Sequence, residues 1–150
     1  IFFSGTFGGE TLSLAAVNAV IKKYESQNVP KYLEEIGTYL LKQLNQLINS
    51  ENLGDIFWTS GHPTWTFLHI KEQKEYFTFE IKTFFLQEMF KRGILTLGSH
   101  NLSFSHTKED IDRLLKVYAE VLPMIKHHIS NKDLLENIQG EILKPLFKVR

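Results

Sequence analysis

The stretch DIFWTSGHPTWTFLHI, residues 55–70, decides the fold class of this chain of 150 residues. Its two halves, residues 55–59 and 64–70, are rich in aromatic and β-branched side chains, which favour strands. Between them lies SGHP, residues 60–63, where glycine and proline favour a turn or a wider loop. The stretch therefore predicts two strands joined by that connection.

Helical periodicity dominates on both sides of this strand pair. Apolar residues recur at helical spacing in four segments: residues 10–25, 30–49, 79–92 and 107–125. Gly93 follows the third segment in the position that closes a helix. Thr107 and Asp110 open the fourth segment with the spacing of a capping box, in which the threonine hydroxyl satisfies an early amide. These four helices surround the predicted strands in sequence.

Shorter elements complete the pattern. Residues 94–97 and 102–105 are short strand candidates on either side of GSHN, residues 98–101. Residues 1–3 read as the end of a further strand, and a short helix is expected through Leu134, Leu135 and Ile138.

The elements together predict an α+β fold with a small, largely antiparallel sheet. The helices over residues 30–49, 79–92 and 107–125 are expected to cover one face of that sheet. The helix over residues 10–25 is expected to pack less tightly against it.

Composition excludes several classes of function. Seventeen basic residues balance seventeen acidic ones, so no long-range field attracts nucleic acid or an anionic membrane. The chain has no cysteine, which excludes disulfides and thiolate metal sites and is compatible with a reducing cytoplasm. No apolar run reaches the roughly 20 residues that span a bilayer. The chain begins at Ile1 without an initiator methionine, and we expect it to be part of a larger protein.

The first candidate site is the loop GTFGG, residues 5–9, at the start of a predicted helix. Backbone amides at a helix start and the hydroxyl of Thr6 can hold a phosphate, and glycines let a ligand approach the backbone. The loop matches neither the Walker A pattern nor the G-x-G-x-x-G pattern. Taken alone, the loop is more simply interpreted as a tight turn.

The second candidate site comprises polar residues in predicted turns, namely His62, His100 and Asn101. Histidine can act as acid, base or ligand near neutral pH, although an ordinary hydrogen-bonding role is the simpler interpretation. The six histidines show no recognised metal spacing, so no metal site is predicted. The lysines occupy polar helix positions, and none has the apolar setting of a lysine that binds a carbonyl cofactor. No catalytic residue is therefore expected in this chain.

Three segments carry a resemblance to a known family. FSGTFGGETLSLAA, residues 3–16, resembles the threonine loop and alanine-rich helix of class III pyridoxal-phosphate (PLP) aminotransferases, most closely the glutamate-1-semialdehyde aminomutase group. LSFSHTKEDID, residues 102–112, is similar to the last strand and capped final helix of that family, and FKRGIL, residues 90–95, to its helix-to-strand junction. Many members have Asn-Pro in place of Glu10 and Thr11.

The resemblance implies a role for each part of the chain. Residues 1–28 would form the phosphate loop and a helix bridging to a large domain, and residues 29–150 the small C-terminal domain of a fold-type I PLP enzyme. Gly5, Thr6 and Phe7 would bind the cofactor phosphate, Thr6 across the interface of a homodimer. His100 and Asn101 would face the substrate.

The implied activity belongs to a longer protein. It would transfer an amino group between a small-molecule amino donor and an oxo acid or aldehyde, as an aminotransferase or as an aminomutase (an isomerase), in the cytoplasm and without nucleic acid or membrane partners. The lysine that attaches the cofactor would lie upstream, so this chain alone is expected to be inactive. Two alternatives remain open from the residues: a non-catalytic dimerisation or protein-interaction module, and a stand-alone binder of a phosphate ligand.

Overall fold

The computed structural model describes residues 5–145 of the chain. The strand expected at residues 1–3 lies outside the described residues. Along the chain the elements are α1 (Thr11–Gln27), α2 (Val29–Ser50), β1 (Phe57–His62), β2 (Trp65–Ile70), α3 (Thr78–Lys91), β3 (Ser99–Asn101), α4 (Lys108–Asn131) and the single 3-10 turn η1 (Leu135–Asn137). All four long helices and both strands of the hairpin were predicted, with bounds within a few residues of these except at the end of α4.

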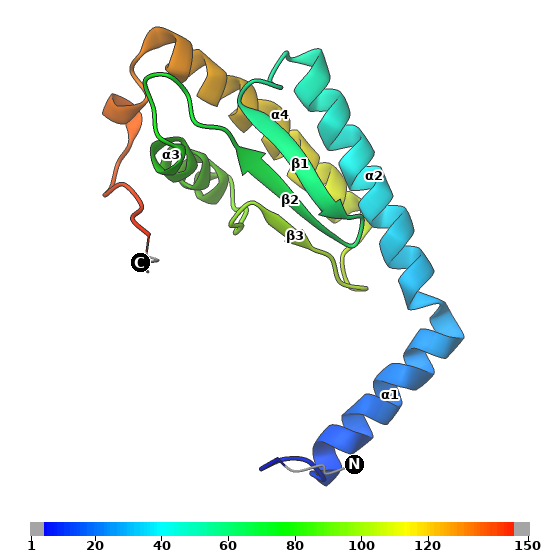
Figure 1. Ribbon diagram of the computed structural model, residues 1–150. Helices are drawn as coiled ribbons and strands as arrows, with labels where there is room; N and C mark the ends of the chain where they lie inside the picture. The colour runs from blue at the N-terminus through cyan, green and yellow to red at the C-terminus, as the bar shows by residue number, and fades with distance from the viewer. Residues whose placement is uncertain (1–4, 146–150) are drawn as a thin grey trace.

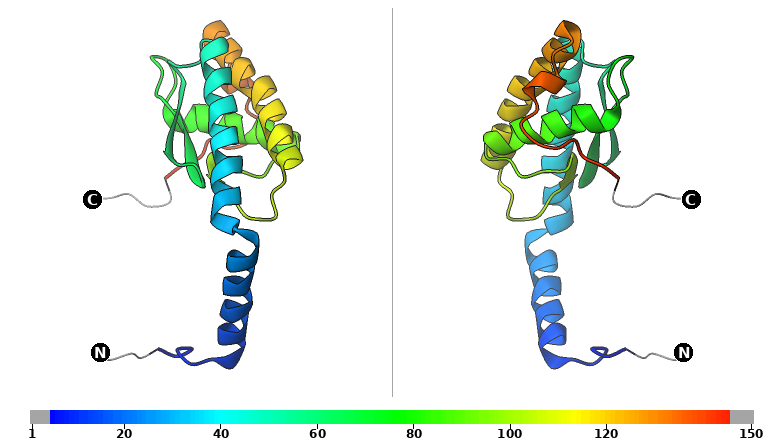
Figure 2. Two further views of the ribbon diagram at one scale, coloured as in Figure 1. Left: turned by 90° about the vertical axis from the view of Figure 1, so that its right-hand side faces the viewer. Right: turned by 90° about the vertical axis from the view of Figure 1, so that its left-hand side faces the viewer.

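The three strands form one antiparallel sheet in the order β1-β2-β3. Helices α2, α3 and α4 lie on one side of this sheet, and no helix of residues 5–145 lies on its other side (Figure 1, Figure 2). The predicted α+β fold, with a largely antiparallel sheet covered on one face by helices, is confirmed.

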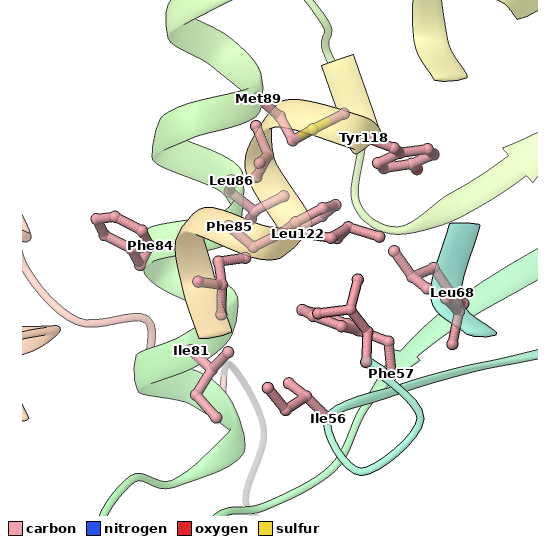
Figure 3. Packing of buried hydrophobic residues seen from close by; sticks show 14 of the residues in the cluster. Ile56, Phe57, Leu68, Ile81, Phe84, Phe85, Leu86, Met89, Tyr118 and Leu122 are labelled. Atoms are coloured by element: carbon pink, nitrogen blue, oxygen red, sulfur yellow. The ribbon is translucent and has the colours of Figure 1, made fainter. Parts of the chain in front are cut away.

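The main core lies between the sheet and the helices (Figure 3). Phe57 of β1 and Leu68 of β2 point towards the helices and are buried. They meet apolar side chains of α3 and α4, among them Phe85 and Tyr118, whose rings stack with centroids 6.2 Å apart. A fully buried aromatic or aliphatic side chain contributes about 1.5–3 kcal/mol through removal of its surface from water. This core therefore holds the body, residues 29–138, together.

A glycine lets α2 approach the hairpin closely. A Cβ added at Gly37 would clash with the carbonyl oxygen of Pro63, in the turn between β1 and β2. Any side chain larger than hydrogen is therefore excluded at this point unless the backbone moves. The turn that the sequence placed between the strands is thus also a packing surface for α2.

Two predicted helix signals are confirmed. Asp110 Oδ2 accepts a hydrogen bond from the Thr107 backbone amide at 2.8 Å, and Thr107 Oγ1 accepts one from the Asp110 amide at 3.3 Å, which completes the capping box of α4. Gly93 follows α3 with a φ of +75°, and its amide donates to the Phe90 carbonyl at 2.9 Å. The start of α4 and the end of α3 are therefore both set by local hydrogen bonds that the sequence predicts.

The prediction of two strands at residues 94–97 and 102–105 was wrong. The strand is β3, in the segment that looked like a connection. Its ladder with β2 is extended at both ends by backbone bonds, since the Leu68 amide donates to the Gly98 carbonyl at 2.7 Å and the Leu102 amide donates to the Thr64 carbonyl at 3.2 Å. Backbone pairing with β2 therefore places this strand in residues 99–101, and the apolar residues 94–97 lie outside the strand.

Two helices differ from expectation at their ends or in their packing. Helix α4 continues beyond residue 125 to Asn131 and contains Pro123, because the tertiary contacts of buried Val121, Leu122 and Ile125 outweigh the hydrogen bond that proline removes. Helix α1 projects from the body and has no buried residue, as expected for loose packing (Figure 2). Of the short helix expected in the tail, one 3-10 turn is present, with Leu134 buried beside it.

Candidate functional site

The glycine loop before α1 forms an exposed turn. The Gly8 amide donates to the Gly5 carbonyl at 3.1 Å, and the Glu10 amide donates to the Phe7 carbonyl at 3.2 Å. Gly5, Thr6 and Phe7, the residues proposed from sequence to hold a phosphate, are all exposed. The turn therefore presents the Thr6 side chain on the surface of this chain.

The start of α1 is already capped by a carboxylate. Glu10 accepts hydrogen bonds from the Ser13 amide at 2.6 Å and from the Leu12 amide at 3.0 Å. Hydrogen bonding to the Ser13 side chain, followed by these bonds from the Ser13 and Leu12 amides, holds the pKa of Glu10 below its ordinary value. Because the carboxylate occupies two of the first amides, a phosphate at this end would have to bind the loop itself, not the helix amides.

The glycines at the ends of this loop have free space around them within the described residues. A Cβ added at Gly5 or Gly9 would meet no heavy atom of residues 5–145 within 4 Å. Crowding inside this part of the chain therefore does not call for glycine at either position. Space at the backbone is what a ligand or another surface would use to approach closely.

A cleft of about 640 Å³ adjoins β3 and the start of α4. Residues 93–97 form one wall, and β3 with Leu102 forms another. His106 and Asp110 from the start of α4 supply polar groups, while most of the lining is apolar. Both residues proposed from sequence to face a substrate, His100 and Asn101, line this cleft.

His100 is a buried member of a hydrogen-bonded network. Its Nδ1 lies 2.8 Å from Thr66 Oγ1 on β2, and its Nε2 lies 2.7 Å from the hydroxyl of Tyr118 on α4. Burial lowers the pKa of His100 from the ordinary 6.5 to about 4, so the ring is neutral at pH 7. Both ring nitrogens are already engaged, which ties β3 to β2 and to α4.

Asn101 lies on the opposite side of β3 from His100. Side chains alternate along a strand, and Asn101 is opposite Trp65 whereas His100 is opposite the buried Thr66. Asn101 is exposed. His62, the other candidate from the turns, is also exposed and places its Nδ1 3.1 Å from Thr64 Oγ1. The structure therefore brings His100 and Asn101 to one cleft but turns their side chains in different directions.

The loop before α1 and strand β3, which lines the cleft, lie far apart within one chain (Figure 1). Helix α1 has 17 residues, which at 1.5 Å per residue separates its ends by about 26 Å. Thr6 and Asn101 therefore do not line one small-molecule site within this chain.

Sequence reasoning did not identify His106 and Asp110 as lining a cleft. Asp110 was read as a capping residue, which it also is, and His106 carried no signal of its own, although it lies one residue before the cap. Among residues 5–145 no group of three or more acidic or histidine side chains could hold a metal ion. Within the same residues no helix is long and apolar enough to cross a membrane.

Comparison with known proteins agrees with this geometry at the level of the fold. A solved structure described as the PLP internal aldimine form of the FumI protein of Sphingopyxis sp. MTA144 is similar, with a TM-score of 0.70 and 18% sequence identity over 87% of this chain and 31% of that one. The chain therefore has the fold of a segment of that protein.

A curated protein is similar in sequence as well. Putrescine aminotransferase of Pectobacterium atrosepticum is 28% identical over 144 residues, 91% of this chain and 29% of the relative. The chain thus spans less than a third of the length of either protein. No family model matches the sequence.

Proposed function

We propose that this chain is the C-terminal part of a PLP-dependent aminotransferase. The observation that carries the proposal is the agreement of two likenesses over nearly the whole chain. One is in sequence, to a putrescine aminotransferase over 91% of the chain, and the other is in fold, to a PLP-containing protein over 87% of it. The transfer would move an amino group between a small-molecule amino donor and an oxo acid or aldehyde.

Finer assignments belong to the same proposal. The three matching segments favour class III and the glutamate-1-semialdehyde aminomutase group, with residues 1–28 as the phosphate loop and bridging helix and residues 29–150 as the small domain. The lack of cysteine fits a reducing cytoplasm, which is the compartment we propose.

The exposed turn fits a role in holding the cofactor phosphate. Gly5 leaves room for close approach, Thr6 adds a hydroxyl donor, and the amide of Phe7 belongs to the same turn. The carboxylate of Glu10 caps α1, so the loop would provide the contacts in place of the helix amides. When bound, PLP supplies the electron sink for the reaction, and this chain would contribute binding and orientation alone.

The length of α1 supports a homodimer as the working form. Helix α1, about 26 Å long, separates the loop from the body that holds the cleft, which is too far for both to contact one PLP molecule. A loop that serves the site of a neighbouring subunit removes this difficulty. The same arrangement is implied by the resemblance to class III enzymes.

In the cleft, we assign the two predicted substrate residues different tasks. Asn101 is exposed and has an amide that can donate and accept hydrogen bonds, so it would contact the substrate. His100 would act through β3, which it fixes through Thr66 and Tyr118.

The test uses cofactor titration of the full-length protein carrying Thr6→Val. Loss of one hydrogen bond to a charged phosphate should cost about 1.5–3 kcal/mol, or about one to two powers of ten in affinity for PLP. Thr11→Val is the matched control, because Thr11 is an exposed threonine just beyond the loop at the start of α1. Equal affinity in wild type and Thr6→Val would make Thr6 a turn residue only.

The 150-residue chain by itself provides a second test. Treated with PLP and borohydride, it should give no specific adduct on one lysine, since the catalytic lysine would lie elsewhere in the longer protein. A single, stoichiometric adduct would contradict this expectation.

A further inference from the structure

The cleft beside β3 has an uneven distribution of charge. Its walls are mostly apolar, and Ile94, Leu95, Leu97 and Leu102 are among the residues that line it. Leu95 and Leu97 are 91% and 69% exposed, so a ligand can reach both side chains in the part of the chain that the structure describes. Within residues 5–145 the lining includes one acidic residue, Asp110, and no lysine or arginine. The cleft therefore combines an apolar wall with a single negative charge.

Asp110 is held as a carboxylate with one free oxygen. Its Oδ2 accepts hydrogen bonds from the Thr107 amide at 2.8 Å and from the Thr107 hydroxyl at 3.1 Å. These bonds, that from the amide first, keep the pKa of Asp110 below its ordinary value, and the charges of His106 and Arg113 act in the same direction with smaller effect. The other oxygen, Oδ1, has no hydrogen-bond partner among residues 5–145. A fixed anion with a free acceptor, suited to an ammonium group, thus lines the cleft.

Arg113 is the competing charge near this cleft. It lies one turn further along α4, and its guanidinium is close to Gly93, where an added Cβ would lie 3.2 Å from Nη2. Arg113 is not one of the lining residues, whereas Asp110 is. Arginine binds carboxylates through paired hydrogen bonds, so a ligand held by Arg113 would carry the opposite charge from one held by Asp110. The two residues therefore predict opposite substrate preferences.

We propose that Asp110 is a specificity-determining residue of the proposed aminotransferase. The leucine wall of the cleft would hold the carbon chain of the amino donor, and the far end of that chain would lie near Asp110. An ammonium group at the far end would be favoured, a methyl group accepted, and a carboxylate disfavoured because like charges repel. The substrate class is thus an alkyl amine or alkyl diamine without a carboxylate. This inference rests on the proposed function.

Three amino donors with the same five-carbon chain test the preference in the full-length protein. Pentylamine, 1,5-diaminopentane and 5-aminopentanoate differ in the charge at the far end. We expect kcat/KM for the diamine to be about fivefold above that for pentylamine, and kcat/KM for 5-aminopentanoate about fivefold below it, the upper end for a solvent-exposed pair of charges. Equal values, or a preference for 5-aminopentanoate, would overturn the proposal.

Asp110→Asn assigns the preference to this residue. Asparagine keeps an oxygen that can accept from the Thr107 amide, so the cap of α4 is retained while the charge is removed. The three kcat/KM values should then agree within about twofold, because the charge interaction is lost. Thr107→Ala is the matched control, since it weakens the cap without removing the charge, and it should keep the wild-type order of donors. Loss of that order in Thr107→Ala would assign the effect to the structure of the α4 start and contradict the proposal.

Arg113→Gln separates the two charges. If Asp110 determines the preference, this variant should keep the order of the three donors and widen the differences, because a positive charge near the cleft is removed. A preference for 5-aminopentanoate in the wild type that disappears in Arg113→Gln would assign the role to Arg113 and overturn the proposal.

Binding without turnover distinguishes this inference from the proposed function. Calorimetric titration of the full-length protein with 1,5-diaminopentane should show binding that is weaker in Asp110→Asn. Such binding in a protein that takes up no PLP would support the charge preference of the cleft and refute the aminotransferase. Transfer at equal rates from all three donors, by a protein that binds PLP, would refute the role of Asp110 alone.

Discussion

Helices α1 and α2 follow one another with only Asn28 between them, yet they are packed in opposite ways. Helix α2 buries Ile36, Leu40, Leu44 and Ile48, which recur every four residues along one stripe. Helix α1 buries none of its side chains. Five of its apolar residues are more than half exposed: Leu12, Leu14, Val17, Val20 and Ile21.

The difference lies in the distribution of apolar residues and not in their number. An apolar stripe on one face predicts a helix that packs against one neighbour, as α2 does. Apolar residues on all sides of α1 do not select a face, and the body covers none of them. Hydrophobic content alone therefore predicts burial correctly for α2 and incorrectly for α1 within this chain.

Truncation of matched leucines should give the largest contrast between the two helices. Leu44→Ala in α2 removes a side chain with 0% exposure and should lower the free energy of unfolding by about 2–5 kcal/mol. Leu14→Ala in α1, where the leucine is 58% exposed, should change it by less than about 0.5 kcal/mol. Urea denaturation of the chain measures both. A large effect of Leu14→Ala would mean that α1 is packed after all.

Acid should destabilise the body through His100, whereas α1 has no buried group that titrates. The folded pKa of about 4 lies below the ordinary 6.5, so the unfolded chain binds a proton that the folded chain does not. The contribution of neutral His100 to the free energy of unfolding is fully present above pH 6.5. It decreases by about 3 kcal/mol as the pH drops to 4.

In the upper part of this pH range, the effect of His100 on stability can be measured without that of Glu88. Burial raises the pKa of Glu88, but hydrogen bonds from Lys91, Gln87 and Arg92 outweigh it and lower the pKa to about 2, so its contribution is lost only below pH 4.5. The free energy of unfolding, measured by denaturation at several pH values, should fall between pH 7 and 4.5 in the wild type. In His100→Gln it should stay constant over this range. A slope of wild-type size in that variant would assign the effect to another group.

Substitution of a glycine should likewise cost more stability in α2 than in the loop before α1. Gly37→Ala places a methyl group against the Pro63 carbonyl and should cost about 1–3 kcal/mol of stability, because either α2 or the hairpin turn has to move. Gly9→Ala, before α1, meets open space within residues 5–145 and should leave the stability of the chain unchanged. Thermal melts of the two variants suffice. Equal midpoints would show that α2 and the turn yield easily.

The smallest effects are expected at the helix starts. Thr107→Ala removes the cap of α4 and should lower global stability by about 0.5–2 kcal/mol. Glu10→Ala removes the cap of α1, and only the protection of the Leu12 and Ser13 amides against hydrogen exchange should decrease. Loss of global stability in Glu10→Ala would contradict the separation of α1 from the body.

The sequence predicted the elements that are set by local rules. Helix periods, the Thr107 cap, the Gly93 stop and the hairpin all depend on residues close together in the chain. Strand β3 depends instead on pairing with β2, more than thirty residues earlier, as the bond partners Thr66 and His100 show. No pattern within residues 94–105 contains that information, so the strand was placed in the apolar residues on either side of its true position.

The candidate site was predictable to a similar extent. The exposed turn around Thr6 agrees with a loop reading, because glycines and a helix start are local signals. The direction of the His100 side chain was not predictable, since it depends on the register of β3 and on the hydroxyl of Tyr118. The role of Thr6, and of Asn101, remains a prediction.

Asn28 is the single-residue joint between α1 and α2. This one residue, in the left-handed conformation with φ 46° and ψ 49°, is all that joins α1 to α2, and Lys23 over the ring of Phe104 at 5.0 Å is a side-chain strut between α1 and the body. A rotation of about 10° at this joint would swing the far end of the 17-residue arm by about 4 Å. Hydrogen bonds tolerate only a few tenths of an ångström. The position of Thr6 therefore depends on the contacts that hold α1 along its length. A mutation that removes such contacts would displace the loop even if it lay far from any ligand.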